Sequence, residues 1–140
     1  MSGQDKDKTN RQPDAYEYEL PGGYQVLAGK TDAENDFLSI KFAAPNDYWF
    51  HVRGMPGSHV ILRLGEKEEP AKDIIKQAAA VAAYHSKARS GGVVPVSCTR
   101  AKHVTKSRGD KPGTVHIRKE TVIKVRPAVP DKVEDRKSVV

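Results

Sequence analysis

The side chains best suited to chemistry gather between residues 47 and 62, a stretch that holds the only tryptophan and two of the five histidines. It begins Asp-Tyr-Trp-Phe-His-Val, an alternating run that predicts a strand. Because side chains two apart on a strand share a face, Asp47, Trp49 and His51 should project together. The Gly/Pro turn that follows would return Ser58 to the end of that strand. We therefore expect a polar cluster at one end of a sheet.

Nucleophilic catalysis is one chemistry for this cluster, since Ser58, His51 and Asp47 supply a nucleophile, a base and an acid that orients the base. However, no Gly-X-Ser-X-Gly elbow surrounds Ser58, and no compact His/Cys/carboxylate motif suggests a metal. We therefore predict no catalytic residue, no metal site and no cofactor. Two alternatives stay open. One is a purely structural cluster, in which Asp47 tightens a turn and Trp49 fills the core. The other is an RNA-processing or base-modifying enzyme that uses Asp47, His51, Ser58 and His59.

Binding of a polyanion is the other chemistry that the sequence favours. Residues 85–126 contain eleven basic and two acidic side chains, a local charge of +9 in a chain whose total is +6. Nucleic acid is the commonest partner of such a segment, although a well-solvated basic surface would have the same composition. In the binding interpretation Arg53 and the basic residues from Lys87 onward contact phosphates, while a histidine or an exposed aromatic ring stacks on bases.

A second basic feature is the run Lys106-Ser-Arg-Gly-Asp-Lys-Pro-Gly113. Its glycines and proline allow a tight exposed loop that carries Lys106, Arg108 and Lys111, whose charges and backbone donors would suit a phosphate. The spacing is not that of a nucleotide-binding loop, and a solvated hairpin turn is the alternative.

One domain with a single core is expected for 140 residues. We assign residues 16–126 to it, residues 1–15 to a disordered N-terminal tail and residues 127–140 to a flexible C-terminal tail. No apolar run approaches the ~18 residues of a membrane span and no secretory signal opens the chain, so we expect a cytoplasmic protein without a membrane partner. The single cysteine, Cys98, excludes an internal disulfide and reads as a packing residue on a strand.

Two helices and a sheet should position these residues. Thr31 and Glu34 match a capping box, which predicts a helix over about 32–42, with a strand as the alternative. Pro70 suits a first helical turn, and an alanine-rich helix with a stripe at 3.6-residue spacing is predicted over about 71–88. β-like runs are expected at residues 16–20, 24–29, 48–52, 59–64, 93–99, 102–106, 114–117 and 121–125. The predicted class is α+β, with both helices packed on a mixed or mostly antiparallel sheet.

Several separately placed motifs resemble the NFACT-R domain, the RNA-binding module of the NFACT proteins of ribosome-associated quality control. They are, in chain order, Gly29-Lys30 with Asn35-Asp36, Asp47-Tyr-Trp-Phe-His51, Pro56-Gly-Ser-His-Val60, Ala78-Ala79 through Ala82-Ala-Tyr84 with Ser86-Lys87, Val94-Pro-Val96, and Lys102-His-Val-Thr-Lys106 with Gly109 and Lys111-Pro-Gly113. The resemblance covers about residues 25–126.

This resemblance implies RNA binding without catalysis, with structured RNA such as tRNA or rRNA, and the large ribosomal subunit, as expected partners. Full-length members also contain an NFACT-N domain and coiled-coil segments, for which 140 residues leave no room, so we expect a stand-alone module without the family's tailing activity. A protein-interaction adaptor is a further alternative. The resemblance and the basic segment together give these expected RNA contacts: His51, Arg53, Ser58, His59, Lys87, Arg89, Lys102, Lys106, Arg108 and Lys111. The residues expected to support the motifs are Asp47, Trp49, Pro56, Gly57, Gly109 and Gly113.

Overall fold

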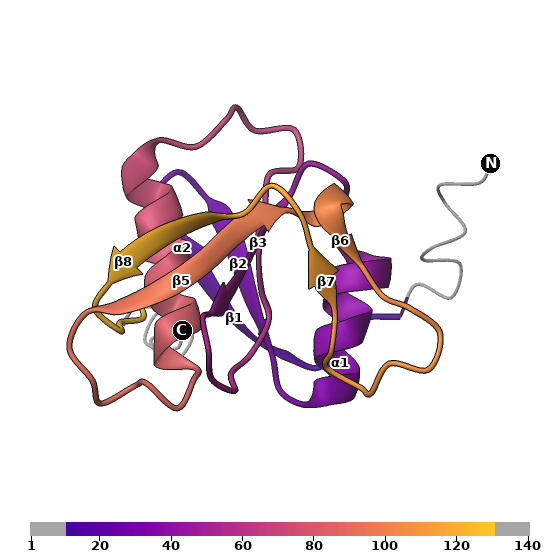
Figure 1. Ribbon diagram of the computed structural model, residues 1–140. Helices are drawn as coiled ribbons and strands as arrows, with labels where there is room; N and C mark the ends of the chain where they lie inside the picture. The colour runs from indigo at the N-terminus through magenta and orange to yellow at the C-terminus, as the bar shows by residue number, and fades with distance from the viewer. Residues whose placement is uncertain (1–10, 131–140) are drawn as a thin grey trace.

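A six-stranded antiparallel sheet forms the centre of the fold in the computed structural model, which describes residues 11–130 (Figure 1). Its strands are β1 (Ala15–Leu20), β2 (Tyr24–Gly29), β3 (Tyr48–Val52), β4 (Val60–Arg63), β5 (Val94–Arg100) and β8 (Thr121–Val125), in the spatial order β1-β2-β4-β3-β5-β8. A separate ribbon pairs β6 (Val104–Thr105) with β7 (His116–Ile117). The helical segments are α1 (Asp32–Asp36), η2 (Phe37–Phe42), α2 (Lys72–Tyr84) and η3 (Ala101–His103). The predicted α+β class is confirmed, and all the strand pairs described are antiparallel.

A helical segment covers each face of the sheet, so the domain has two cores. Successive residues of a strand belong to the two cores in turn. On β2, Val26 belongs to the core beneath α2, whereas Leu27 belongs to the core beneath η2. On β3, Phe50 joins the first core and Trp49 the second. Successive side chains of a strand point to opposite faces, so this alternation is what the pleat requires. Both faces of β3 therefore contribute buried side chains, Trp49 on one and Phe50 and Val52 on the other.

The segment at residues 32–42 is helical, as predicted, and not a strand. Thr31 caps it by accepting a hydrogen bond from the backbone N–H of Glu34, at 3.1 Å. The Glu34 carboxylate does not complete the box but accepts from the backbone N–H of Asp14, at 2.9 Å. After Asp36 the helix widens into the π-helical turn η2, which closes with a bond from the N–H of Ala43 to the carbonyl of Leu38.

The long helix α2 is shorter than the predicted 71–88, chiefly because tertiary contacts end it. His85 leaves helical geometry (φ −93°, ψ 45°), and its carbonyl accepts from the backbone N–H of Ser58 at 2.8 Å. The N–H of Lys87 donates to the carbonyl of Pro56 at 3.2 Å. Backbone groups that would extend the helix are thus paired with the 53–59 turn instead. The run Ser90-Gly-Gly92, whose glycines favour helix ends, lies beyond the actual end of α2.

Parts of both expected tails lie against the domain. The guanidinium of Arg11 lies 3.9 Å from the ring centroid of Phe37, and the N–H of Ala128 donates to the carbonyl of Ala80 at 3.2 Å. The remaining residues of the two expected tails, 1–10 and 131–140, lie outside the described residues. Within residues 11–130 no helix has the length and apolar character needed to cross a membrane.

Candidate nucleic-acid interface

The turn at residues 53–59 meets the end of α2 in direct backbone contact. Gly57 pairs with Ser86 as an isolated antiparallel bridge. A Cβ atom on Gly57 would lie 2.7 Å from the Cβ of Ser86, so only glycine fits this approach. The sequence motif around Gly57 therefore encodes a contact with a segment about thirty positions away.

A groove of about 360 Å³ opens where this turn, the start of α1 and the residues after α2 converge. We call it the Lys87 groove. Three cationic side chains line it, from Lys30, Lys87 and Arg89, together with the single carboxylate of Asp32. In the described part of the chain the Lys87 ammonium makes no ion pair, and Lys30 is 3.5 Å from the Asp14 carboxylate. The groove is therefore positive and has a cation available for an anionic ligand.

Arg89 and Ser58 are fixed in this groove by backbone carbonyls. The Nε of Arg89 donates to the carbonyl of Tyr84 at 2.7 Å, and its guanidinium lies 4.0 Å from the Tyr84 ring centroid. The Ser58 hydroxyl donates to the carbonyl of Gly29 at 2.6 Å. Because its one proton is used there, Ser58 presents an acceptor rather than a donor to the groove.

His59, expected to contact RNA, instead lies inside the fold with 3 % of its surface exposed. The Trp49 Nε1–H donates to the Ser39 hydroxyl oxygen at 2.8 Å, and that hydroxyl lies 2.8 Å from His59 Nδ1. His59 Nε2 lies 3.1 Å from the carbonyl oxygen of Gly113. A carbonyl only accepts, so Nε2 carries the proton and Nδ1 accepts from Ser39. Burial, with His51 nearby, lowers the pKa of His59 to about 4 and keeps the ring neutral.

His51 and Arg53 line a smaller cavity of about 270 Å³ beside the groove. The His51 ring lies 5.4 Å from that of His59, edge to face, and burial lowers the pKa of His51 as well. Arg53 is exposed and pairs with Glu120 at 3.3 Å. His51 is thus half-buried and neutral at neutral pH, whereas Arg53 carries its charge at the surface.

The loop at residues 106–113 is held against α1 by its first lysine. The Lys106 ammonium donates to the carbonyls of Lys111 and Thr114 at 2.7 and 2.8 Å and lies 3.2 Å from the Asp36 carboxylate. The other Asp36 oxygen accepts from the N–H of Gly113 at 3.0 Å. The Lys106 side chain therefore stabilises the loop conformation and is not free at the surface.

The exposed charges of this loop come from Arg108 and Lys111. Gly109 and Gly113 have φ values of +90° and +88°, which favour glycine. A Cβ on Gly113 would lie 2.9 Å from the carboxylate of Asp32, which lines the Lys87 groove. The loop and the residues after α2 accordingly lie along the same lower side of the molecule in Figure 1.

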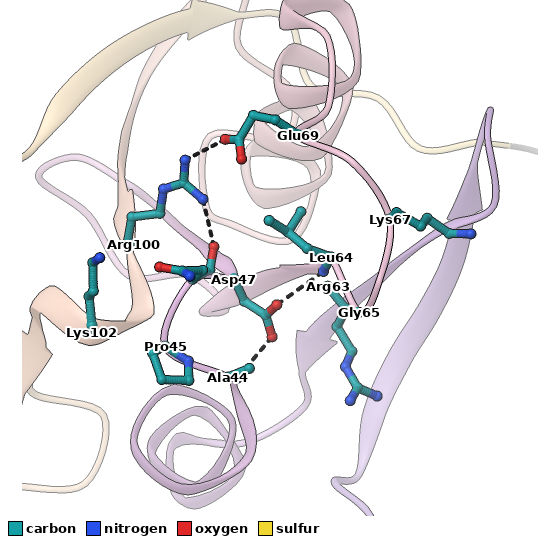
Figure 2. Close-up of a pocket in the computed structure, with 11 residues that line it drawn as sticks. Ala44, Pro45, Asp47, Arg63, Leu64, Gly65, Lys67, Glu69, Arg100 and Lys102 are labelled. Atoms are coloured by element: carbon teal, nitrogen blue, oxygen red, sulfur yellow. Dashed lines mark hydrogen bonds and ion pairs between the residues drawn. The ribbon is translucent and has the colours of Figure 1, made fainter.

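Asp47 and Lys102 lie at the other end of β3, in a larger groove of about 590 Å³ that we call the Arg100 groove. The Asp47 carboxylate accepts from the N–H groups of Ala44 and Leu64 at 2.9 and 3.0 Å. Figure 2 shows this carboxylate turned toward both residues and Arg100 turned toward Glu69. Asp47 thus joins two chain segments and does not reach the Lys87 groove.

The two arginines of the Arg100 groove are engaged by the protein itself, whereas Lys67 and Lys102 also line the groove. Arg100 pairs with Glu69, donates to the carbonyl of Asn46 at 2.7 Å and lies 4.0 Å from the Tyr48 ring centroid. Arg63 lies over the ring of Phe42. These arginines are less available to an outside anion than the Lys87 ammonium.

A further basic patch, which sequence reasoning did not single out, surrounds His103. Desolvation lowers the pKa of His103, and the positive charges of Arg118, Lys102 and Lys119 lower it further. Lys102 was expected as a contact, whereas Arg118 and Lys119 were counted only in the basic segment. The sequence feature that could have indicated this patch is the excess of positive charge between residues 85 and 126, which includes Lys102, Arg118 and Lys119.

The arrangement needed for catalysis by Ser58 does not form. Asp47 and Ser58 lie at opposite ends of β3, and the described residues show no hydrogen bond joining either of them to His51. Within residues 11–130 no group of three His, Cys, Asp or Glu side chains could hold a metal ion. In the described part of the chain the geometry provides a cationic groove, and Ser58 is not activated by His51 and Asp47.

The comparisons with known proteins agree on one family. The family described as NFACT protein RNA binding domain matches residues 15–119. The protein named Rqc2 homolog RqcH from Bacillus subtilis (strain 168) is 38 % identical over 138 residues, which cover 99 % of this chain and 24 % of that protein. The mouse protein named Coiled-coil domain-containing protein 25 is 42 % identical over 67 residues, 48 % of this chain and 31 % of that protein. The chain thus spans about a quarter of the Bacillus relative.

A solved structure has the same fold. It is the C-terminal part of the fibronectin/fibrinogen-binding protein from Streptococcus suis, with a TM-score of 0.78 and 35 % sequence identity. The match covers 89 % of this chain and 49 % of that one.

Proposed function

This chain belongs to the family of NFACT RNA-binding domains, and from that premise we propose that it binds structured RNA, of the tRNA or rRNA type, without catalysing a reaction. The surface proposed for this binding consists of the Lys87 groove, the neighbouring loop at residues 106–113 and the patch around His103. Phosphate contacts from these cations would supply most of the affinity.

The observation that carries the proposal is the charge of the Lys87 groove. Lys30, Lys87 and Arg89 converge there with one lining carboxylate, and Lys87 makes no ion pair within the described residues. A phosphate entering the groove would therefore meet a cation that need not first leave a protein partner. In the larger Arg100 groove an anion would have to compete with Glu69 for the guanidinium.

The cellular setting that we propose is ribosome-associated quality control, on the large ribosomal subunit. Support comes from the family and from the relatives named Rqc2 homolog RqcH. Sequencing of RNA crosslinked to the protein in cells should give tRNA or rRNA. A protein-interaction adaptor would instead keep its partners after nuclease treatment.

The direct test compares two double variants that each remove two positive charges. Lys87→Gln with Arg89→Gln removes two of the three cations that line the groove, whereas Lys72→Gln with Lys76→Gln removes exposed charges from α2. RNA affinity is measured over a range of salt concentrations. If six phosphates are contacted, the wild-type slope of log K against log salt should be roughly −4 to −5.

The groove variant should bind more weakly and have a slope smaller in magnitude by about 1.4–1.8, since each lost contact contributes about 0.7–0.9. The α2 variant should keep the wild-type slope. Wild-type binding that barely responds to salt, or equal losses in the two variants, would contradict the proposal.

A further inference from the structure

An exposed tyrosine is stacked on a histidine at the mouth of the Lys87 groove. The ring centroids of Tyr16 on β1 and His85 after α2 are 4.5 Å apart, with an interplanar angle of 14°. Both residues line the groove, and 45 % of Tyr16 is exposed. An aromatic ring that is open to solvent beside cations is a surface on which a nucleobase stacks.

The histidine beneath this ring is held in place from several sides. The Tyr18 hydroxyl lies 2.6 Å from His85 Nε2, and the Tyr84 ring stands at 82° to the imidazole with centroids 5.1 Å apart. The carbonyl of His85 accepts from the N–H of Ser58. Burial and the nearby Arg89 charge lower the pKa of His85 to about 4, so its ring is neutral at neutral pH. Tyr16 therefore rests on a support that does not have to be ordered when a ligand arrives.

The cations of the groove line it together with this ring. Lys30 Nζ lies 4.9 Å from the Tyr16 ring centroid and 3.5 Å from the Asp14 carboxylate. Both contacts are at the surface and are weaker than stacking of a base on an aromatic side chain. An incoming base would therefore displace the Lys30 ammonium, which would then be close to the phosphate of the same nucleotide. Lys87 and Arg89 come shortly after His85 in the chain, in the run His85-Ser-Lys-Ala-Arg89.

We infer that Tyr16 stacks on one unpaired nucleobase of the bound RNA while Lys30, Lys87 and Arg89 bind the adjacent phosphates. This rests on the proposed RNA binding and specifies which nucleotides the groove takes. Bases inside a duplex are covered by their neighbours on both faces, whereas bases in loops, bulges and ends can be splayed out onto an aromatic ring. The volume of about 360 Å³ lies within the range of small-ligand sites, about 300–1,000 Å³.

The test uses two substitutions of Tyr16 and two RNAs. Tyr16→Leu removes the ring, and Tyr16→Phe keeps it. The RNAs are an unstructured strand of about 12 nucleotides with a fluorescent 2-aminopurine base, and a fully paired duplex of the same length. Tyr16→Leu should lose about tenfold in affinity for the single strand and nothing for the duplex, with an unchanged salt slope because no charge is removed. The wild type and Tyr16→Phe should quench 2-aminopurine fluorescence, and Tyr16→Leu should not.

Two results would overturn the inference while leaving RNA binding intact: an unchanged single-strand affinity in Tyr16→Leu, or an equal loss on strand and duplex. In both cases the Lys87→Gln with Arg89→Gln variant still loses affinity and salt slope. If the wild type binds tRNA but neither of these two RNAs, the inference fails and the proposed function stands; if it binds neither tRNA nor rRNA either, both fail. Thermal unfolding of both Tyr16 variants shows whether a loss of binding comes from a loss of folding, and quenching by the wild type tests the stack without any variant.

Discussion

The imidazole of His59 is hydrogen-bonded to the backbone of Gly113, with 3.1 Å between Nε2 and the carbonyl oxygen. The two residues are 54 positions apart in the sequence. The contact attaches the end of the basic loop at residues 106–113 to the start of β4. The position of that loop therefore depends on a neutral, buried histidine.

Lowering the pH should destabilise the protein through His59. Its pKa is about 4 in the folded state and about 6.5 when unfolded, so the unfolded chain binds the proton first as pH falls. The contribution of His59 is fully present above about pH 6.5 and is lost progressively toward pH 4, by on the order of 3 kcal/mol. Urea unfolding at several pH values measures this. In His59→Gln the free energy of unfolding should fall less between pH 6.5 and 4. Part of the fall should remain because His85 has a similar pKa.

A decline in His59→Gln as steep as that of the wild type would rule out this assignment. His116→Gln is the control for a histidine on the exposed strand β7: it removes the 2.8 Å pair with Asp110 but should leave the His59-dependent part of the decline in place.

Ser39→Ala should destabilise the core beneath η2. The Ser39 hydroxyl accepts from Trp49 and donates to His59, so its loss leaves two buried polar groups without partners. Each such group costs about 1–3 kcal/mol. Denaturant unfolding gives the change, and the exposed Ser90→Ala should stay within about 0.5 kcal/mol of the wild type. Equal effects of the two substitutions would mean that the Ser39 bonds contribute nothing.

Gly57→Ala should weaken both folding and RNA binding. The added methyl group would meet the Cβ of Ser86 at 2.7 Å and its Cα at 3.1 Å, which would force the 53–59 turn away from the end of α2. Forced overpacking of this kind costs about 1–3 kcal/mol. In Gly92→Ala the nearest atom would be 3.8 Å away, on the flexible side chain of Arg126, so this control should behave as the wild type. Thermal unfolding and RNA titration report the two effects, and a Gly57→Ala protein of wild-type stability would show that the contact relaxes freely.

Lys106 and Lys111 should behave differently although both are lysines of one loop. Lys106→Met loses bonds to two carbonyls and to Asp36, so the loop should become more easily cut by proteases and the protein less stable. Lys111→Met removes an exposed charge, so stability should hold while the salt slope of RNA binding falls by about 0.7–0.9. Each variant is the control for the other. Identical salt slopes and stabilities in the two would contradict the separate roles.

Local patterns were enough to predict most of the elements. The capping residue Thr31, the alternation in the β3 segment and the small residues of α2 are read from neighbours in the sequence, and each was found in the expected element. The end of α2 was predicted wrongly because Pro56 and Ser58, far away in the chain, take the backbone groups of His85 and Lys87.

Sequence patterns alone predict an α+β domain with a basic second half and a turn that carries polar residues, because periodicity, turn residues and charge are properties of neighbouring positions. The surroundings of each polar residue, by contrast, depend on the folded arrangement of the whole chain. His59 and Lys106 have the side chains of RNA contacts, yet His59 is enclosed by Trp49 and Ser39 and Lys106 is bound by Asp36. Burial and hydrogen-bond partners come from segments that are distant in the chain, so no local pattern reports them.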